Sequence, residues 1–199
     1  MNSASAELDH AAVRSGHEPV RPDRLRGVMS RFATGVTVLT VGGEHLHAMT
    51  ANAFSSVSLH PPSVLCSVGH SAVMHGALTG AGRFAVNILG AHQEPLARHF
   101  ADKSRTLGAA QFERVDWRPG EHTGAPLLDD SVAWLECELT ESHAFGDHTI
   151  FIGTVLAAGE GATSDGLLFV NGRFGKPARA LSIAAAKPLA HSRLTRDRS

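Results

Sequence analysis

Residues 49–68 read MTANAFSSVSLHPPSVLCSV, and the interpretation of the whole chain starts from this stretch. Small and polar side chains fill its first half, a Pro61–Pro62 corner follows, and an apolar run from Val64 to Val68 ends it. Small side chains let a ligand approach the backbone, and hydroxyl and amide groups are neutral donors and acceptors that suit a phosphate and a sugar-like chain. The same composition also fits a serine-rich loop between two strands.

Strand-like segments joined by short turns surround this stretch. Residues 36–41 are apolar on both faces, as in a buried strand, and Gly42–Gly43 predicts a hairpin turn into residues 44–49. Short helices are predicted over residues 22–32, 72–78 (capped by Ser71) and 92–100. Further strands are predicted beside the Pro-Pro corner and over residues 83–89, 132–141, 149–157 and 167–170. About seven strands, linked mostly by hairpins, favour a mainly β fold, an antiparallel barrel with a few short helices.

Length and charge narrow the functional classes. The 199 residues predict one domain over residues 21–176, flanked by a disordered N-terminal arm (1–20) and a C-terminal arm (177–199). A formal net charge of -1 provides no field that would recruit nucleic acid or a membrane surface, and no apolar run is long enough to span a bilayer. Cys66 and Cys137 lie in apolar runs without metal-ligand spacing, which predicts buried, reduced thiols in a cytoplasmic protein and no metal site.

The usual nucleotide and hydrolase motifs are missing from the sequence. It has no G-x-G-x-x-G after a strand, no phosphate loop, no H-E-x-x-H and no G-x-S-x-G. A nucleotide or cofactor must therefore be held without these fingerprints.

Four segments together carry a resemblance to a known family. They are FATGVTV at residues 32–38, MTANAFSSVSL at 49–59, FAVNIL at 84–89 and GDH at 146–148. In this order they resemble the short-chain flavin reductases, the NAD(P)H:flavin oxidoreductase components of two-component flavin-dependent monooxygenases. The resemblance implies a split β-barrel of the FMN-binding type and a homodimer. It also implies an enzyme that uses NADH or NADPH to reduce FMN or FAD and supplies diffusible reduced flavin to a separate monooxygenase.

The resemblance also implies a set of site residues. His148 is the candidate catalytic-site residue, bordering the nicotinamide as a positioning group. After the Pro-Pro strand, where such families often have a basic residue near the phosphate, this chain offers only His70 and Ser71. The implied flavin-binding residues near the isoalloxazine ring are Thr34, Gly35 and Val36, and those lining the ring edge and ribityl chain are Thr50, Ala51, Asn52 and Ala53. Ser55, Ser56, Cys66 and Ser71 would face the ribityl or phosphate region. Phe84 and Asn87 would lie close to these residues, and Arg173 and Phe174 would close the pocket.

Each candidate has a structural alternative, and the function has competing hypotheses. Cys66 and Phe84 fit core packing, Asn52 and His148 fit turn positions, and the serines fit solvated or capping positions. Glu136 and Glu138 share one face of a predicted strand, which we expect to be exposed or at an interface. One alternative function is a flavin- or haem-binding or redox-sensing module without nicotinamide turnover. The related amine-oxidase branch is disfavoured because residues 35–89 contain Arg83 as their single Lys or Arg.

Overall fold

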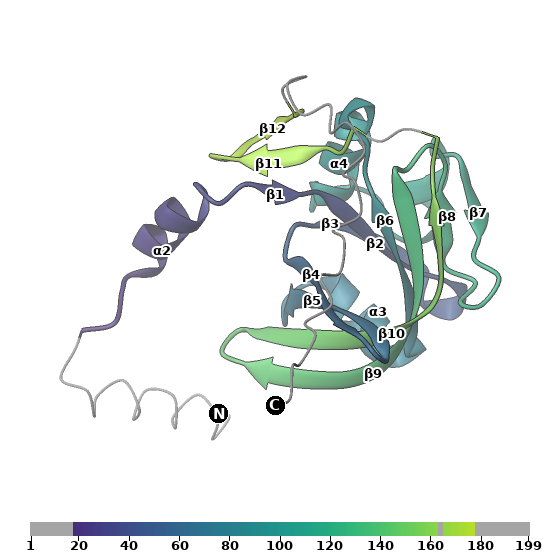
Figure 1. Ribbon diagram of the computed structural model, residues 1–199, viewed down its shortest axis with the longest axis horizontal. Helices are drawn as coiled ribbons and strands as arrows, with labels where there is room; N and C mark the ends of the chain where they lie inside the picture. The colour runs from purple at the N-terminus through teal and green to yellow at the C-terminus, as the bar shows by residue number, and fades with distance from the viewer. Residues whose placement is uncertain (1–17, 163–164, 178–199) are drawn as a thin grey trace, which may run out of the picture.

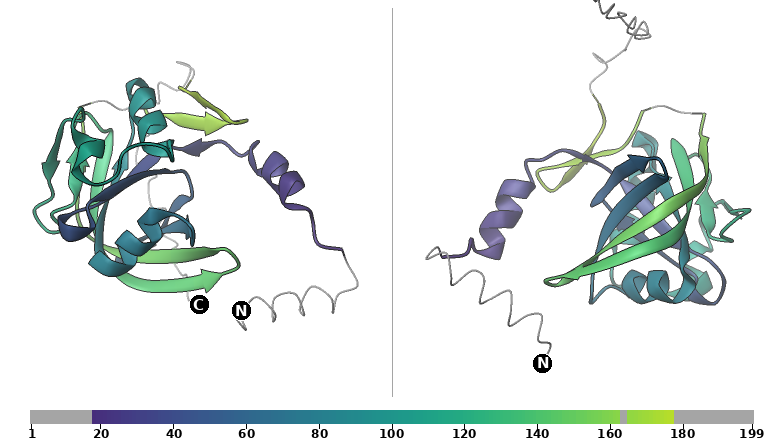
Figure 2. Two further views of the ribbon diagram at one scale, coloured as in Figure 1. Left: turned by 180° about the vertical axis from the view of Figure 1, so that it is seen from behind. Right: turned by 60° about the horizontal axis from the view of Figure 1, so that its bottom comes forward.

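Seven antiparallel strands form one strongly curved sheet. The computed structural model describes residues 18–162 and 165–177 (Figure 1). The strand order is β3-β2-β6-β9-β10-β5-β4. The strands are β2 (Thr37–Val41), β3 (His47–Ala51), β4 (Phe54–Leu59), β5 (Pro62–Gly69), β6 (Arg83–Ile88), β9 (Ala133–Phe145) and β10 (His148–Glu160). The predicted antiparallel sheet is confirmed, and β9 and β10 form a longer hairpin than the sequence indicated (Figure 2).

The sheet is split between its two edge strands, β3 and β4. These strands are consecutive in the chain and are joined by Asn52 and Ala53, yet among the described residues no ladder pairs them. The Pro61–Pro62 corner turns β4 back onto β5, with Phe54 opposite Cys66. The segment 49–55 therefore crosses the split of the barrel: its two ends pair with β2 and β5, while Asn52 and Ala53 lie between the ladders and are exposed.

Two helices cap the curved sheet and one stands apart from it. Helix α3 (Val73–Ala81) buries Met74, Ala77 and Leu78, and α4 (Glu94–Ala101) buries Ala97 and Phe100. Helix α2 (Pro22–Met29) has no buried residue and projects away from the sheet (Figures 1 and 2). The prediction that Ser71 caps a helix is wrong, because α3 has Ala72 at its N-cap and no side-chain capping hydrogen bond.

The core has two main apolar clusters, one inside the curved sheet and one beneath α4. The first packs Leu39, Phe84 and Phe151 against α3, and the second packs Val36 and Leu89 against α4. The full burial of β2 matches its apolar pattern on both faces. Cys66 and Cys137 are free and buried, as predicted, and burial raises the pKa of each thiol to about 12.

Small sheets and short helices complete the described fold. Strand β1 (Thr34–Gly35) pairs with β11 (Leu168–Val170), which forms a hairpin with β12 (Arg173–Gly175) through the predicted Asn171–Gly172 turn. Both turn residues have positive φ, as a type I′ turn requires. The remaining elements are η1 (Gly43–His45), η2 (Ala91–Gln93), η3 (Gly108–Phe112), β7 (Trp117–Pro119) and β8 (Pro126–Leu128). Because η1 occupies the turn after β2, the returning strand begins at His47 rather than at residue 44.

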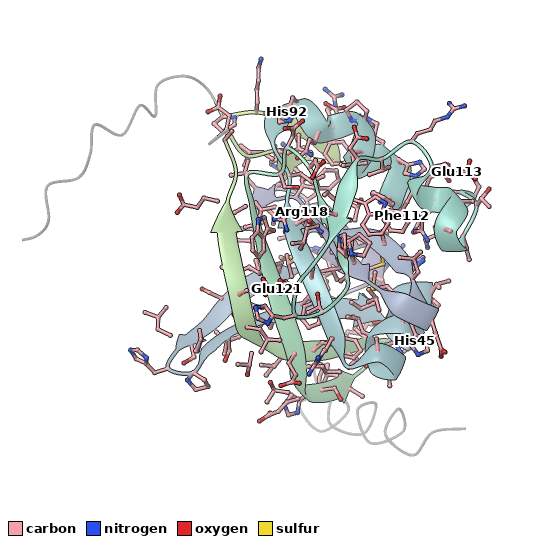
Figure 3. The ribbon with its side chains drawn as sticks, turned by 90° about the vertical axis from the view of Figure 1, so that its right-hand side faces the viewer. His45, His92, Phe112, Glu113, Arg118 and Glu121 are labelled. Carbon is pink, nitrogen blue, oxygen red and sulfur yellow. The ribbon has the colours of Figure 1, made fainter. Side chains whose placement is uncertain are left out.

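The β7–β8 hairpin covers the outer face of β6 and β9 (Figure 3), an arrangement that the sequence analysis did not predict. The expectation that Glu136 lies on an exposed or interface face is wrong, since this residue is 1% exposed. Its Oε1 accepts hydrogen bonds from the backbone N–H groups of His122 and Thr123 and from the Thr123 hydroxyl, at 2.8 to 2.9 Å. Burial opposes ionisation of the carboxyl, but these hydrogen bonds prevail and hold the pKa of Glu136 below its ordinary value.

Candidate functional site

The segment 49–55 separates two cavities. We name them the arm-side cavity, of about 520 Å³, and the basic cavity, of about 380 Å³. The arm-side cavity is lined by Arg26, Met29, Ser30, Phe32, Thr34, Asn52, Ala53, Phe54, Ser55, Leu65, Ser67 and Phe169. The basic cavity is lined by His47, Met49, Thr50, Ser71, Ala72, Val73, Phe100, Ala101, Lys103, Arg105 and Leu107. The residues on one short segment thus reach both cavities.

The arm-side cavity lies between α2, the β3–β4 connection and β11. It brings together four of the predicted flavin-binding residues: Thr34, Asn52, Ala53 and Ser55. Most of its surface is apolar, with Phe32 and Phe169 among the walls. The Thr34 hydroxyl oxygen is buried and has no hydrogen-bond partner in the described part of the chain. A buried polar atom without a partner carries a free-energy cost, which a ligand hydrogen bond would relieve.

The basic cavity gathers donors from two separate segments, the connection after α4 and the start of α3. Arg105 donates to the carbonyls of Ala48 and Asp102, while its Nε is buried and unpartnered among the described residues. Lys103 is exposed at the same rim. Helix α3 begins at this cavity with Ala72 as its N-cap, so that no side chain occupies the first-turn N–H groups. Two cationic side chains and an uncapped helix N-terminus favour an anion.

The histidine beside Arg105 remains neutral at physiological pH. His47 is 4% exposed, and its Nε2 lies 3.4 Å from a terminal nitrogen of Arg105. Burial, and then the positive charge of Arg105, lower the pKa of His47 to about 4. His47 therefore adds no charge to the cavity near pH 7, and Arg105 and Lys103 carry its positive charge.

The structure places four predicted flavin contacts in the protein interior. Val36, Cys66, Phe84 and Asn87 are all 0% exposed. Both ends of the Asn87 amide are hydrogen-bonded within the protein, because its Nδ2 donates to Pro126 O and its Oδ1 accepts from Leu128 N. The protein's own atoms surround these four side chains, and the prediction that they lie near a bound flavin stays a prediction.

Of the other predicted residues, two line the basic cavity and the rest line neither cavity. Thr50 and Ser71 line the basic cavity, although the Thr50 hydroxyl donates to Ala97 O at 2.7 Å. Phe174 packs on the cavity residue Phe169, with ring centroids 5.1 Å apart, and lies under Arg98. The remaining predicted residues, which line neither cavity, are Gly35, Ala51, Ser56, His148, Arg173 and Phe174. For this group the role in flavin or nicotinamide binding stays a prediction.

His148 is half exposed at the start of β10, after the Gly146–Asp147 turn. Its Nδ1 lies 2.7 Å from Asp147 Oδ1, and the ring rests against the backbone of Gly69. The hydrogen bond and the charge of His148 lower the pKa of Asp147 below its ordinary value. The imidazole is thus held beside the β5–α3 connection, next to the residues that lead into the basic cavity.

Sequence reasoning missed Lys103 and Arg105. They belong to the polar stretch after α4, residues 101–124, which we expected to run over the surface. The tertiary structure folds this stretch beside β3, so that Arg105 reaches Ala48 O. Two basic residues separated by a single serine were the available signal, but nothing in the local pattern ties them to Thr50. Arg26 and Phe169 of the arm-side cavity were missed for the same reason.

A split antiparallel barrel with an apolar cavity and a basic cavity on either side of one polar segment defines a nucleotide-binding protein of the flavin-reductase class. The chain belongs to the flavin reductase like domain family, whose model matches residues 29–178. The sequence-based predictions of family, fold class and activity class are confirmed.

Relatives and solved structures agree with this assignment. The chain is 54% identical over 151 residues to an NADH-dependent FAD reductase of Streptomyces globisporus, covering 76% of this chain and 83% of that protein. The structure resembles BorF, the flavin reductase component of a bacterial two-component tryptophan halogenase, with a TM-score of 0.76, 46% identity and coverage of 80% and 100%. It also resembles S. globisporus C-1027 NADH:FAD oxidoreductase SgcE6 in complex with NAD and FAD fragments, with a TM-score of 0.76, 49% identity and coverage of 83% and 99%.

Proposed function

We propose that this chain catalyses the reduction of free flavin by NADH, with FAD or FMN as the flavin substrate. The observation that carries the proposal is the pair of unlike cavities along residues 49–55, one largely apolar and one cationic. A flavin nucleotide has the same division, because an apolar ring system is joined through a short polar chain to a phosphate. The two Streptomyces globisporus relatives are named for NADH and FAD, which supports the same chemistry.

The arm-side cavity suits the flavin ring. Its volume of about 520 Å³ falls within the range of roughly 300 to 1,000 Å³ that is usual for ligand cavities. Asn52 and the unpartnered Thr34 hydroxyl supply hydrogen bonds to ring heteroatoms, and Ala53 leaves room for a planar group. Phe169 and Phe32 provide apolar walls.

The basic cavity suits the phosphate. Thr50 and Asn52 are separated by one residue of extended chain, or about 7 Å, so the two cavities are a short polar chain apart. Arg105 and Lys103 would bind the phosphate through charge-assisted hydrogen bonds, and the free N–H groups at the start of α3 would add neutral donors. This cavity supplies the cationic group that the segment after the Pro-Pro strand lacks.

The reaction moves a hydride from the nicotinamide to the flavin, leaving NAD⁺ and reduced flavin, and needs no protein nucleophile. The chain's residues bind the two substrates, align their rings and stabilise the negative charge of the reduced flavin through backbone and Asn52 donors. His148 borders the nicotinamide as a positioning group. Small residues along 49–55 and few charges near the ring fit a flavin that is released after reduction.

A second copy of the chain is the proposed partner of α2. Leu25, Val28 and Met29 of α2, at the spacing of one helix face, and Phe32 just after the helix are 54% to 66% exposed. Such an apolar face needs a cover, and a homodimer would provide it beside the arm-side cavity. Light scattering should then give the mass of two chains, and a monomer would exclude this arrangement.

We further propose that the reduced flavin diffuses to a separate monooxygenase in the cytoplasm. The relative BorF is the reductase component of a two-component system, and the two free cysteines of this chain fit a reducing compartment. Among the described helices, none has the length and apolar character needed to cross a membrane.

The test is the loss of absorbance at 340 nm when the protein, NADH and air are combined with or without added flavin. We expect turnover that requires free FAD or FMN, and slower turnover with NADPH. A stoichiometric flavin that survives dialysis, together with no NADH oxidation, would instead support a flavin-binding or redox-sensing module. Running all three common flavins in parallel identifies the preferred substrate.

A further inference from the structure

One buried hydroxyl lies between two imidazoles next to the GDH turn. Thr149 is 5% exposed and immediately follows His148. Its Oγ1 lies 3.1 Å from His70 Nε2 and 2.9 Å from His75 Nε2. The two rings meet edge to face with centroids 5.2 Å apart, and His75 packs in the same way on the buried Phe151. The hydroxyl therefore connects β10 to the β5–α3 connection and to α3.

Both histidines bond to the same hydroxyl. A hydroxyl has one hydrogen to donate and two lone pairs, so Thr149 donates to at most one imidazole and accepts from the other, or accepts from both. In either case the contact restrains the orientation of each ring. His75 is fixed on α3 and against Phe151, which makes the α3 side of the network rigid.

The same network holds the backbone of the turn. The backbone N–H of His70 donates to Asp147 O at 2.9 Å, directly before His148. His148 is opposite Gly69 in the β10–β5 pairing, and its Nε2 would lie 3.5 Å from a Cβ on that glycine. The half-exposed imidazole is therefore restrained from both sides, by Asp147 and by the His70 segment.

We propose that Thr149, together with His70 and His75, is a positioning residue that holds His148 for the nicotinamide. This inference rests on the proposed function, in which His148 borders the nicotinamide. The three residues act through the turn and touch neither substrate. Loss of the hydroxyl frees both imidazoles and leaves the His70 segment tied to the turn by its backbone hydrogen bond to Asp147 O, so that His148 is restrained less tightly.

The test is Thr149→Val, which keeps the shape and the β-branch but removes the hydroxyl. Thr154→Val on the same strand is the matched control, since its hydroxyl bonds to Thr140 at the opposite part of the hairpin. We expect Thr149→Val to raise the KM for NADH about fivefold, with kcat and the flavin KM within about twofold, and the control to change neither. Thr149→Ser should restore the NADH KM.

A double-mutant cycle with His148→Ala separates positioning from a general loss of structure. If Thr149 acts through His148, adding Thr149→Val to His148→Ala gives no further rise in the NADH KM. Additive effects, or an equal rise in the flavin KM, would overturn the proposal.

The imidazole resonances of His148, read by NMR without substrates, test the restraint independently of activity. They should shift in Thr149→Val and not in Thr154→Val. If the enzyme fails to oxidise NADH but these shifts occur, the proposed function fails while the positioning network stands. Unchanged resonances would refute the network itself.

Discussion

Asn87 and Asn52 are two asparagines that both resemble flavin ligands in sequence, and they lie in opposite environments. Asn87, on β6, is fully buried under the β7–β8 hairpin, and both ends of its amide are hydrogen-bonded. Asn52, at the split between β3 and β4, is exposed at the arm-side cavity and makes no side-chain hydrogen bond within the described residues. In the first region the asparagine side chain forms hydrogen bonds within the fold, and in the second it remains available to a ligand.

The unpaired buried atoms follow the same division. Under the hairpin, Glu136 and Asn87 are buried polar side chains with partners. Around the two cavities, Thr34 Oγ1 and Arg105 Nε are buried without partners among the described residues; Ser131 Oγ, near the end of β10, is the third such atom. A folded protein seldom leaves such groups unsatisfied, so the two beside the cavities support the proposal that a ligand binds there.

The largest expected effect comes from making the same substitution in both regions. Asn87→Leu leaves Leu128 N and other buried groups without partners and should lower the free energy of unfolding by about 3 kcal/mol, with the flavin KM unchanged in the folded protein. Asn52→Leu should change stability by less than about 0.5 kcal/mol and raise the flavin KM. Urea unfolding and steady-state kinetics measure both, and a reversed pattern would refute the comparison.

The next effect is a pH dependence of stability arising at the edge of the basic cavity. His47 has a pKa of about 4 in the folded state, against an ordinary value of 6.5 in the unfolded chain. Between these values the unfolded state binds a proton that the folded state does not, so stability is complete above pH 6.5 and is lost as the pH falls towards 4, by up to about 3 kcal/mol.

The variant His47→Gln should reduce this dependence. Thermal unfolding from pH 7 to pH 5, where most carboxylates stay ionised, should give a smaller fall in Tm for the variant than for the wild type. An equal fall in Tm for the variant and the wild type would show that His47 has the same pKa in the folded and unfolded states.

A smaller and more local effect is expected at Arg105. Arg105→Gln removes the buried guanidinium from the basic cavity and should raise the flavin KM about tenfold, the usual scale for one charge-assisted hydrogen bond. Arg114→Gln is the matched control, because Arg114 lies on the separate surface hollow beside α4 and η3. Fluorescence titration of flavin measures both affinities, and similar losses in the two variants would mean that net charge, rather than the cavity, governs binding.

The hairpin turns and apolar patterns of this chain are local properties, and they predicted most of the fold. Residues 36–41 were recognisable as a buried strand because both faces are apolar. Asn171–Gly172 was recognisable as a hairpin turn because a turn with two successive positive φ angles favours these residue types. The capping role of Ser71 was wrong because the chain offers Ala72 at the N-cap, and a serine nearby is a weak signal by itself.

Side-chain roles depended on distant residues. Cys66 and Phe84 fitted both a core and a ligand contact in sequence, and only the packing of α3 inside the curved sheet places them in the core. Glu136 seemed a surface residue because the loop at Thr123 that buries it lies on another part of the chain. Burial by a segment that is distant in sequence does not change the local hydrophobic periodicity, so the sequence pattern does not predict it.

The sequence by itself determined the succession of strands along the chain, the turns between them and the polar segment 49–55, because hydrophobic periodicity and turn chemistry act between near neighbours. Only the tertiary structure decided that Lys103 and Arg105 join Thr50 and Ser71 in one cavity, while Asn87 is enclosed beneath the β7–β8 hairpin. The physical reason is that a cavity is formed by side chains from several distant segments, and each segment is compatible with many surroundings until the others have folded around it.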